Sequence, residues 1–142
     1  MPRTLGSCAQ ADARTTRLGG FDVSFLPQQK RVRHMRRITA AYLVHWGLPE
    51  LVDNVQLIVS ELVTNAIDHG NGPVRLKVAC RGGEVRVEVR DGNAVPATLR
   101  EADEDDESGR GLGIVAYLAS DWGVSPDGTT TWCSFLLPTA SP

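Results

Sequence analysis

The chain has 142 residues, of which 42% are hydrophobic and 23% charged, and its formal net charge is -2. This length and composition are typical of one globular domain with a continuous core. The small negative charge argues against an overall basic field that would attract nucleic acid or a membrane surface.

The three cysteines are widely spaced and form no C-x-x-C pair or Cys/His cluster, which argues against zinc and disulfide frameworks. Cys80 and Cys133 fall in strand-like segments and are expected to be buried thiols. The first twenty residues lack the apolar run of a secretion signal, and no stretch is apolar enough to span a bilayer. We expect a soluble, cytoplasmic protein with a flexible tail over residues 1–20 and one domain over residues 21–138.

Residues 21–26 alternate apolar and polar side chains, which predicts a short strand. Residues 28–46 have apolar side chains at helical spacing and are followed by a glycine, which predicts a helix. One face of this helix carries the basic cluster of residues 30–37. That face is either a solvated surface or a contact for phosphates or an acidic protein.

A second helix is predicted from Pro49 to about His69, because proline suits a first helical turn and Gly70 suits the end. Its predicted buried stripe contains Val52, Val55, Val59, Leu62 and Ala66. Residues 74–80 and 84–89 then alternate on either side of a tight turn, as in an antiparallel hairpin.

Residues 93–108 have no periodicity, and six of the seven residues at 101–107 are acidic, so we expect a mobile loop. A short helix over residues 112–118 and a hairpin of residues 122–124 and 130–137 complete the chain. This order predicts an α/β two-layer sandwich, in which helices pack on one face of a mixed, mostly antiparallel sheet.

Glu61 and Asn65 lie one turn apart at the edge of the second helix's apolar stripe, and His69 continues the same line. Partly buried carboxylate and amide oxygens suit a hydrated Mg²⁺ ion or a water that needs a base. The alternative is an ordinary polar helix surface.

Asp91 follows a strand and precedes Gly92, so it is either a hydrogen-bond acceptor for an exocyclic amine or part of a plain turn. Gly109, Gly111 and Gly113 open the third predicted helix, where close backbone approach and unpaired amides favour phosphate binding. Neither a βαβ unit nor a Lys-Ser/Thr pair accompanies them, so this is neither the dinucleotide fingerprint nor a P-loop.

Together these segments resemble the motifs of the ATPase superfamily of gyrase, Hsp90, histidine kinases and MutL. The residues at 61–70 (ELVTNAIDHG) resemble its N box, Asp91-Gly92 the start of its first glycine box, residues 109–113 the second, and residues 128–130 (GTT) the terminal Thr motif. The short length, SELVTNA and GTTTW are most similar to bacterial anti-sigma-factor serine kinases. The first box departs from the family pattern, since residues 91–95 read DGNAV where Asp-x-Gly-x-Gly is usual.

This resemblance implies an ATP site with Mg²⁺. It implies that Asn65 ligates the metal and that Glu61 is the catalytic base or orients the attacking hydroxyl. Asp91 would read the adenine amino group, with Thr130 supporting it through water. The remaining expected ATP-binding residues are His69, Arg110, Gly111, Leu112 and Gly113.

The resemblance also implies a serine/threonine-protein kinase that binds a sigma factor and phosphorylates an anti-anti-sigma partner, and a homodimer through the first strand and helix. The retained Glu61 favours this activity. The departed first glycine box favours a non-catalytic module that uses ATP to shape a protein-binding surface. Direct binding of nucleic acid through residues 30–37 has little support from the sequence.

Overall fold

The computed structural model describes residues 19–92 and 107–137, with the side chains of residues 107–112 excepted. The expected flexible tail, most of the acidic loop and Cys8 therefore lie outside the described residues. The described elements follow in the order β1 (Gly19–Phe25), α3 (Lys30–His45), η1 (Pro49–Leu51), α4 (Val52–His69), β2 (Val74–Arg81), β3 (Glu84–Arg90), α5 (Glu107–Leu118), β4 (Asp121–Val124) and β5 (Thr130–Leu136).

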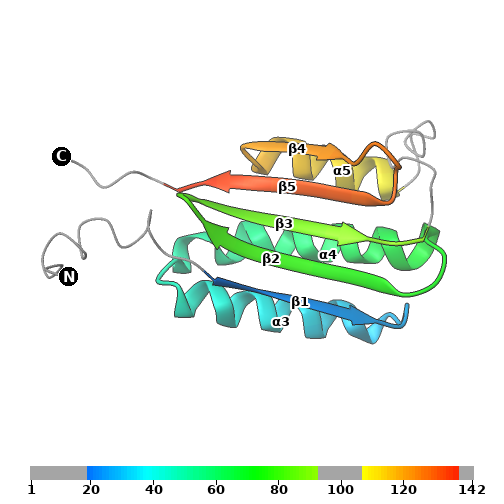
Figure 1. The fold of residues 1–142 in the computed structure, drawn as a ribbon, viewed down its shortest axis with the longest axis horizontal. Helices are drawn as coiled ribbons and strands as arrows, with labels where there is room; N and C mark the ends of the chain where they lie inside the picture. The colour runs from blue at the N-terminus through cyan, green and yellow to red at the C-terminus, as the bar shows by residue number, and fades with distance from the viewer. Residues whose placement is uncertain (1–18, 93–106, 138–142) are drawn as a thin grey trace, which may run out of the picture.

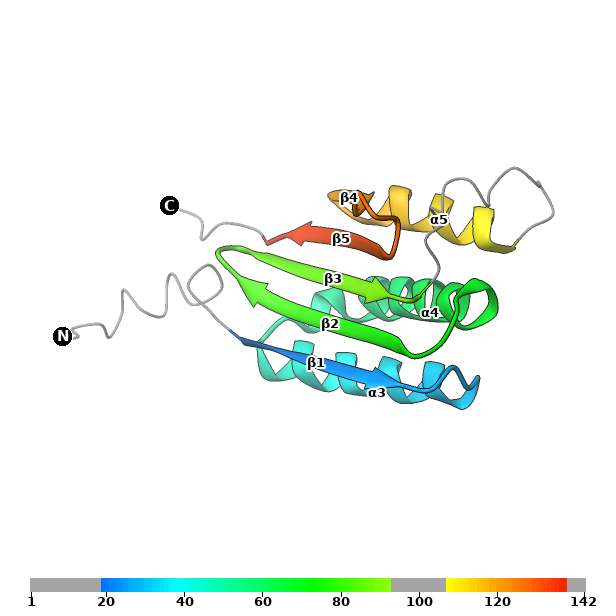
Figure 2. The ribbon, with the colours of Figure 1, turned by 45° about the vertical axis from the view of Figure 1, so that its right-hand side comes forward.

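The five strands form one sheet in the order β1-β2-β3-β5-β4, and α3, α4 and α5 lie on one of its faces (Figure 1). The view in Figure 2 shows the same two layers from a second direction. Every neighbouring pair is antiparallel, so the expected two-layer sandwich is confirmed, while its sheet is wholly antiparallel rather than mixed. Short turns account for two of these pairs, β2–β3 and β4–β5, whereas β1–β2 and β3–β5 are joined through intervening helices.

The core lies between the sheet and the helices. Residues of β2 and β3 alternate strictly, with Val, Leu and Cys side chains inward and, apart from Ala79, charged side chains outward. The predicted stripe of α4 is confirmed at four of its five positions, while Val52 is half-buried. The inward side chains of these three elements are buried, namely Val55, Ile58, Val59, Leu62, Val63, Ala66, Val74, Leu76, Val78, Cys80, Val85, Val87 and Val89.

The two described cysteines, Cys80 and Cys133, are buried thiols, as expected. Desolvation raises the pKa of the Cys133 thiol to about 12, so it behaves as a small apolar side chain. Among the described residues, no helix combines the length and apolar character that a membrane crossing needs.

One element boundary differs markedly from expectation. The sequence predicts that the third helix begins near Leu112, after a glycine-rich loop. In the structure α5 begins at Glu107 and contains Gly109, Gly111 and Gly113. Each glycine in a helix interior costs about 1 kcal/mol relative to alanine. Packing of α5 against α4 and β4 compensates, because tertiary contacts override weak local propensity.

Candidate functional site

Polar groups from distant segments converge at the end of the sheet where α4 and β3 both finish. Figures 1 and 2 show the end of α4, the end of β3, the β4–β5 turn and the first turn of α5 on the same side of the molecule. The antiparallel order of the strands produces this grouping, because β3 ends and β5 begins at the same end of the sheet. This end is the candidate site.

Glu61, Asn65 and His69 follow one another at single-turn intervals along α4. Glu61 and Asn65 are half-buried and His69 is exposed in the last turn. The adjacent positions Leu62 and Ala66 are buried, so the polar line runs along the edge of the packed stripe. The structure therefore places these three residues as the spacing predicted.

The side-chain carbonyl oxygen of Asn65, Oδ1, is buried and accepts no hydrogen bond in the described structure. An unsatisfied buried acceptor costs about 1–3 kcal/mol. A cation supplied with a ligand would satisfy this oxygen, and carbonyl oxygens are normal Mg²⁺ ligands.

The backbone at Asp91 is packed tightly against the end of α4. A Cβ atom on Gly70 would lie 2.3 Å from the Ala66 carbonyl oxygen and 2.8 Å from the Asp91 Cβ. A Cβ atom on Gly92 would lie 2.1 Å from the Asn71 carbonyl oxygen. Glycine is therefore required at both positions for the two segments to touch, and this contact brings Asp91 to the end of the Glu61–Asn65–His69 line.

The β4–β5 turn holds Asp91 from the other side. The Asp91 amide donates to the Thr129 carbonyl oxygen at 3.0 Å. The Asp127 carboxylate accepts from the Ser125 hydroxyl at 2.6 Å and from the amide and hydroxyl of Thr129 at 3.0 and 2.8 Å. These bonds, of which the one from Ser125 is the largest cause, lower the pKa of Asp127 to about 2, so the carboxylate is ionised at neutral pH.

The sequence interpretation overlooked Asp127, Ser125 and the packing role of Gly70. A signal for the turn was present, because Asp, Pro and Gly in residues 125–128 are typical of turns whose side chains bond their own backbone. The Gly70 contact left no such signal, since it joins Gly70 to Asp91, 21 residues further along the chain.

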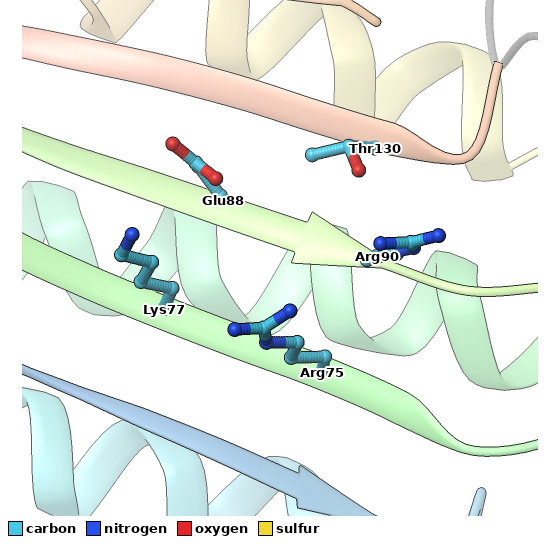
Figure 3. A pocket seen from close by; sticks show the side chains of 5 residues that line it. All are labelled: Arg75, Lys77, Glu88, Arg90 and Thr130. Atoms are coloured by element: carbon cyan, nitrogen blue, oxygen red, sulfur yellow. The ribbon is translucent and has the colours of Figure 1, made fainter. Parts of the chain in front are cut away.

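Thr130 is the first residue of β5 and lies directly opposite Arg90 of β3. Its side chain lines a hollow on the helix-free face of the sheet, with Arg75, Lys77, Glu88 and Arg90 (Figure 3). Thr130 pairs with Arg90 across the β3–β5 ladder, and directly opposed side chains share a face of the sheet, so both point away from the helices. The expected role of Thr130 at the nucleotide site stays a prediction, while the residue that bonds the Asp91 backbone is Thr129.

Arg110, Gly111 and Leu112 lie within the first half of α5, so the backbone amides there are helical rather than part of a loop before the helix. Gly113 is exposed, and a Cβ there would meet no described atom within 4 Å beyond its own helix backbone. Core packing therefore does not require glycine at this position. The expected roles of these four residues in phosphate binding stay predictions.

The donor set fits a nucleotide-bound metal better than a metal held by protein alone. Across the described residues there is no cluster of three or more His, Cys, Asp or Glu side chains able to cage an ion. Mg²⁺ in nucleotide sites keeps several waters and takes only one or two protein oxygens besides the phosphates. The unpartnered Asn65 Oδ1 supplies one such ligand.

Comparison with known proteins supports the same assignment. The histidine kinase-like ATPase domain family matches residues 25–135, which include every element from α3 to β4. A comparison with curated proteins gives no match. With a two-layer sandwich, an N-box helix and Asp91 held at its end, the chain belongs to the histidine kinase-like ATPase domain family.

Proposed function

We propose that this ATP-binding protein is a serine/threonine-protein kinase of the anti-sigma-factor type, which binds a sigma factor and phosphorylates an anti-anti-sigma protein. The observation that carries the proposal is the position of Glu61 on α4, one turn before Asn65, whose side-chain oxygen accepts no hydrogen bond in the described structure. Nucleotide binding alone requires a metal ligand but no base, whereas phosphoryl transfer uses both.

Each residue then has a defined role. Asn65 would hold Mg²⁺ against the phosphates, and Asp91 would accept a hydrogen bond from the adenine amino group. Glu61 would accept the proton of a serine or threonine hydroxyl as that oxygen bonds to the γ-phosphorus and ADP leaves. His69, exposed at the end of α4, would contact the phosphates.

A non-catalytic module that uses ATP to shape a protein-binding surface is the second candidate. The departed first glycine box favours it, because residues 93–95 (NAV) lack the later glycines of the family pattern. These residues lie outside the described structure. Location in the cytoplasm, the homodimer through β1 and α3, and the partners named above remain parts of the proposal.

Transfer of radiolabelled phosphate from ATP to candidate anti-anti-sigma proteins tests the kinase proposal. Glu61→Gln should abolish transfer while leaving ATP affinity within about twofold, since the amide keeps the shape but is no base. Asp53→Asn, an exposed acid in the first turn of the same helix, is the matched control and should transfer normally. Equal transfer by Glu61→Gln would favour the non-catalytic module.

A further inference from the structure

The helix-free face of the sheet carries a concentration of positive charge that the nucleotide site does not use. Arg75, Lys77 and Arg90 line one hollow of about 110 Å³ together with Glu88 and Thr130. Figure 3 shows all five side chains on the side of β2, β3 and β5 that faces away from the helices. This cluster is unexpected on a chain whose net charge is -2.

The strand register works against this arrangement at Arg75 and Arg90, whereas Lys77 lies between two acids, Asp22 and Glu88. Arg75 lies directly opposite Arg90 in the β2–β3 ladder, and Lys77 opposite Glu88. Like charges at directly opposed positions destabilise a sheet. A surface selected only for stability would be expected to place an acid at one of the two positions.

The nearby carboxylates only partly compensate for these cations. Asp22 on β1 accepts two hydrogen bonds from Arg75, which lowers the pKa of Asp22. Glu88 is paired with Arg86 at 2.8 Å. Lys77 and Arg90 are both exposed and have no ion pair with another described residue. The positive charge of Arg90 also attracts the Asp127 carboxylate at longer range.

The hollow continues along the strands. A second hollow of about 420 Å³ shares Lys77 and Glu88 with the first and extends to the β2–β3 turn, where Arg81 and Glu84 line it. Arg86, also on this wall, stacks over the Trp132 ring at 4.3 Å. The two hollows together form a trough that follows β2 from Arg75 to Arg81, six residue steps or roughly 20 Å of strand. That length fits a peptide segment better than a single anion.

We propose that this trough is a docking surface for an acidic segment of a partner protein. Carboxylates of the segment would pair with Arg75, Lys77 and Arg90. Because these cations would stay partly solvated in the complex, the affinity should depend on salt concentration. The proposal does not depend on the nucleotide site or on kinase activity, because every residue in it lies on the opposite face.

Charge pattern distinguishes this occupant from two others. A nucleic acid presents phosphates continuously and would place some against Glu84 and Glu88, whereas a protein segment can alternate acids with other side chains. A second copy related by a two-fold axis would set the same cations against one another. A peptide with spaced acidic side chains matches the trough better than either.

The test uses the whole chain, 15N-labelled, with a fluorescein-labelled ten-residue peptide of alternating Glu and Ser as the probe. Amide shifts on titration should map to β2, β3 and β5, and binding should weaken at least about fivefold between 50 and 300 mM salt. The double variant Lys77→Ser with Arg90→Ser should weaken binding by about fivefold or more. Its melting temperature should equal or exceed that of the wild type, since it relieves the Arg75–Arg90 opposition.

Arg33→Ser with Arg37→Ser is the matched control, because it removes two exposed cations from α3 and should change affinity less than about twofold. Equal weakening by the two double variants, or shifts confined to α3, would overturn the proposal. So would tighter binding of a ten-nucleotide oligothymidylate to the same strands, which would identify a nucleic-acid surface instead.

Discussion

The amide N–H of Asp91 donates a hydrogen bond to the carbonyl oxygen of Thr129, 3.0 Å away. Asp91 follows β3 and Thr129 precedes β5, so this bond extends the β3–β5 ladder beyond its last pair, Arg90 and Thr130. Asp127 in turn fixes Thr129 through its amide and hydroxyl. The residue expected to read adenine is thus positioned by a turn that lies far along the chain.

Replacing Asp127 with Ala should lower stability at neutral pH and weaken ATP binding, because the turn loses its central acceptor. The folded-state pKa of about 2 lies below the usual 3.8, so the ionised carboxylate contributes fully above pH 3.8 and its contribution is lost as pH falls toward 2. The gap in melting temperature between wild type and D127A should stay constant from neutral pH to about pH 5 and narrow below about pH 4. A gap of constant size down to pH 2 would contradict this.

Gly70→Ala should destabilise the fold by about 1–3 kcal/mol, as overpacking does, and should weaken ATP binding. Gly70 has φ -84° and ψ -174°, which any residue can adopt, so the cost is steric. Chemical unfolding and calorimetry would measure both effects. Gly72→Ala is the control: its φ of +86° causes backbone strain, but its Cβ meets no described atom within 4 Å, so ATP affinity should survive.

Gly113→Ala should stabilise the apo protein by about 0.5–1 kcal/mol, because alanine is the better helix former and the site has room. If the phosphates approach this backbone, the added methyl group should weaken ATP binding at the same time. Opposite signs in unfolding and binding experiments would support the phosphate assignment. A variant that is more stable and binds ATP normally would remove Gly113 from the site.

Asn65→Ala should weaken binding of ATP with Mg²⁺ by at least about tenfold, equivalent to roughly 1.4 kcal/mol. Stability without ligand should not fall correspondingly, because the variant removes an acceptor that has no protein partner. Isothermal titration calorimetry with and without Mg²⁺ separates the metal contribution from direct contact. Asn54→Ala, an exposed position on the same helix, should bind like the wild type, and equal affinity of both variants would exclude Asn65 as the ligand.

Adenine should be preferred over guanine, because the Asp91 carboxylate accepts from an amino group that guanine lacks at the same ring position. In competition experiments, ATP should displace a labelled adenine nucleotide at least about tenfold better than GTP. Asp91→Asn should reduce this preference, since the amide can present a donor in place of the second carboxylate oxygen. Displacement by GTP as effective as by ATP would refute the assignment.

The sequence by itself determined the elements whose signals are local. Alternation in β2 and β3, and the apolar stripe and terminal glycine of α4, predicted these elements to within a residue or two, except that a 3-10 turn at Pro49 precedes α4. The line of Glu61, Asn65 and His69 followed from helical spacing alone. In each case the period of the backbone decides which side chains share a face, and that period is written in a few consecutive residues.

Tertiary structure decided what depends on contacts between distant segments. The start of α5 at Glu107 reflects packing on α4 that outweighs three glycines. The side of the sheet to which Thr130 points depends on the pairing of β5 with β3, since a register shift of one residue would reverse it. The contact of Gly70 with Asp91, and the opposition of Arg75 and Arg90, arise only when the chain has folded and the strands have paired.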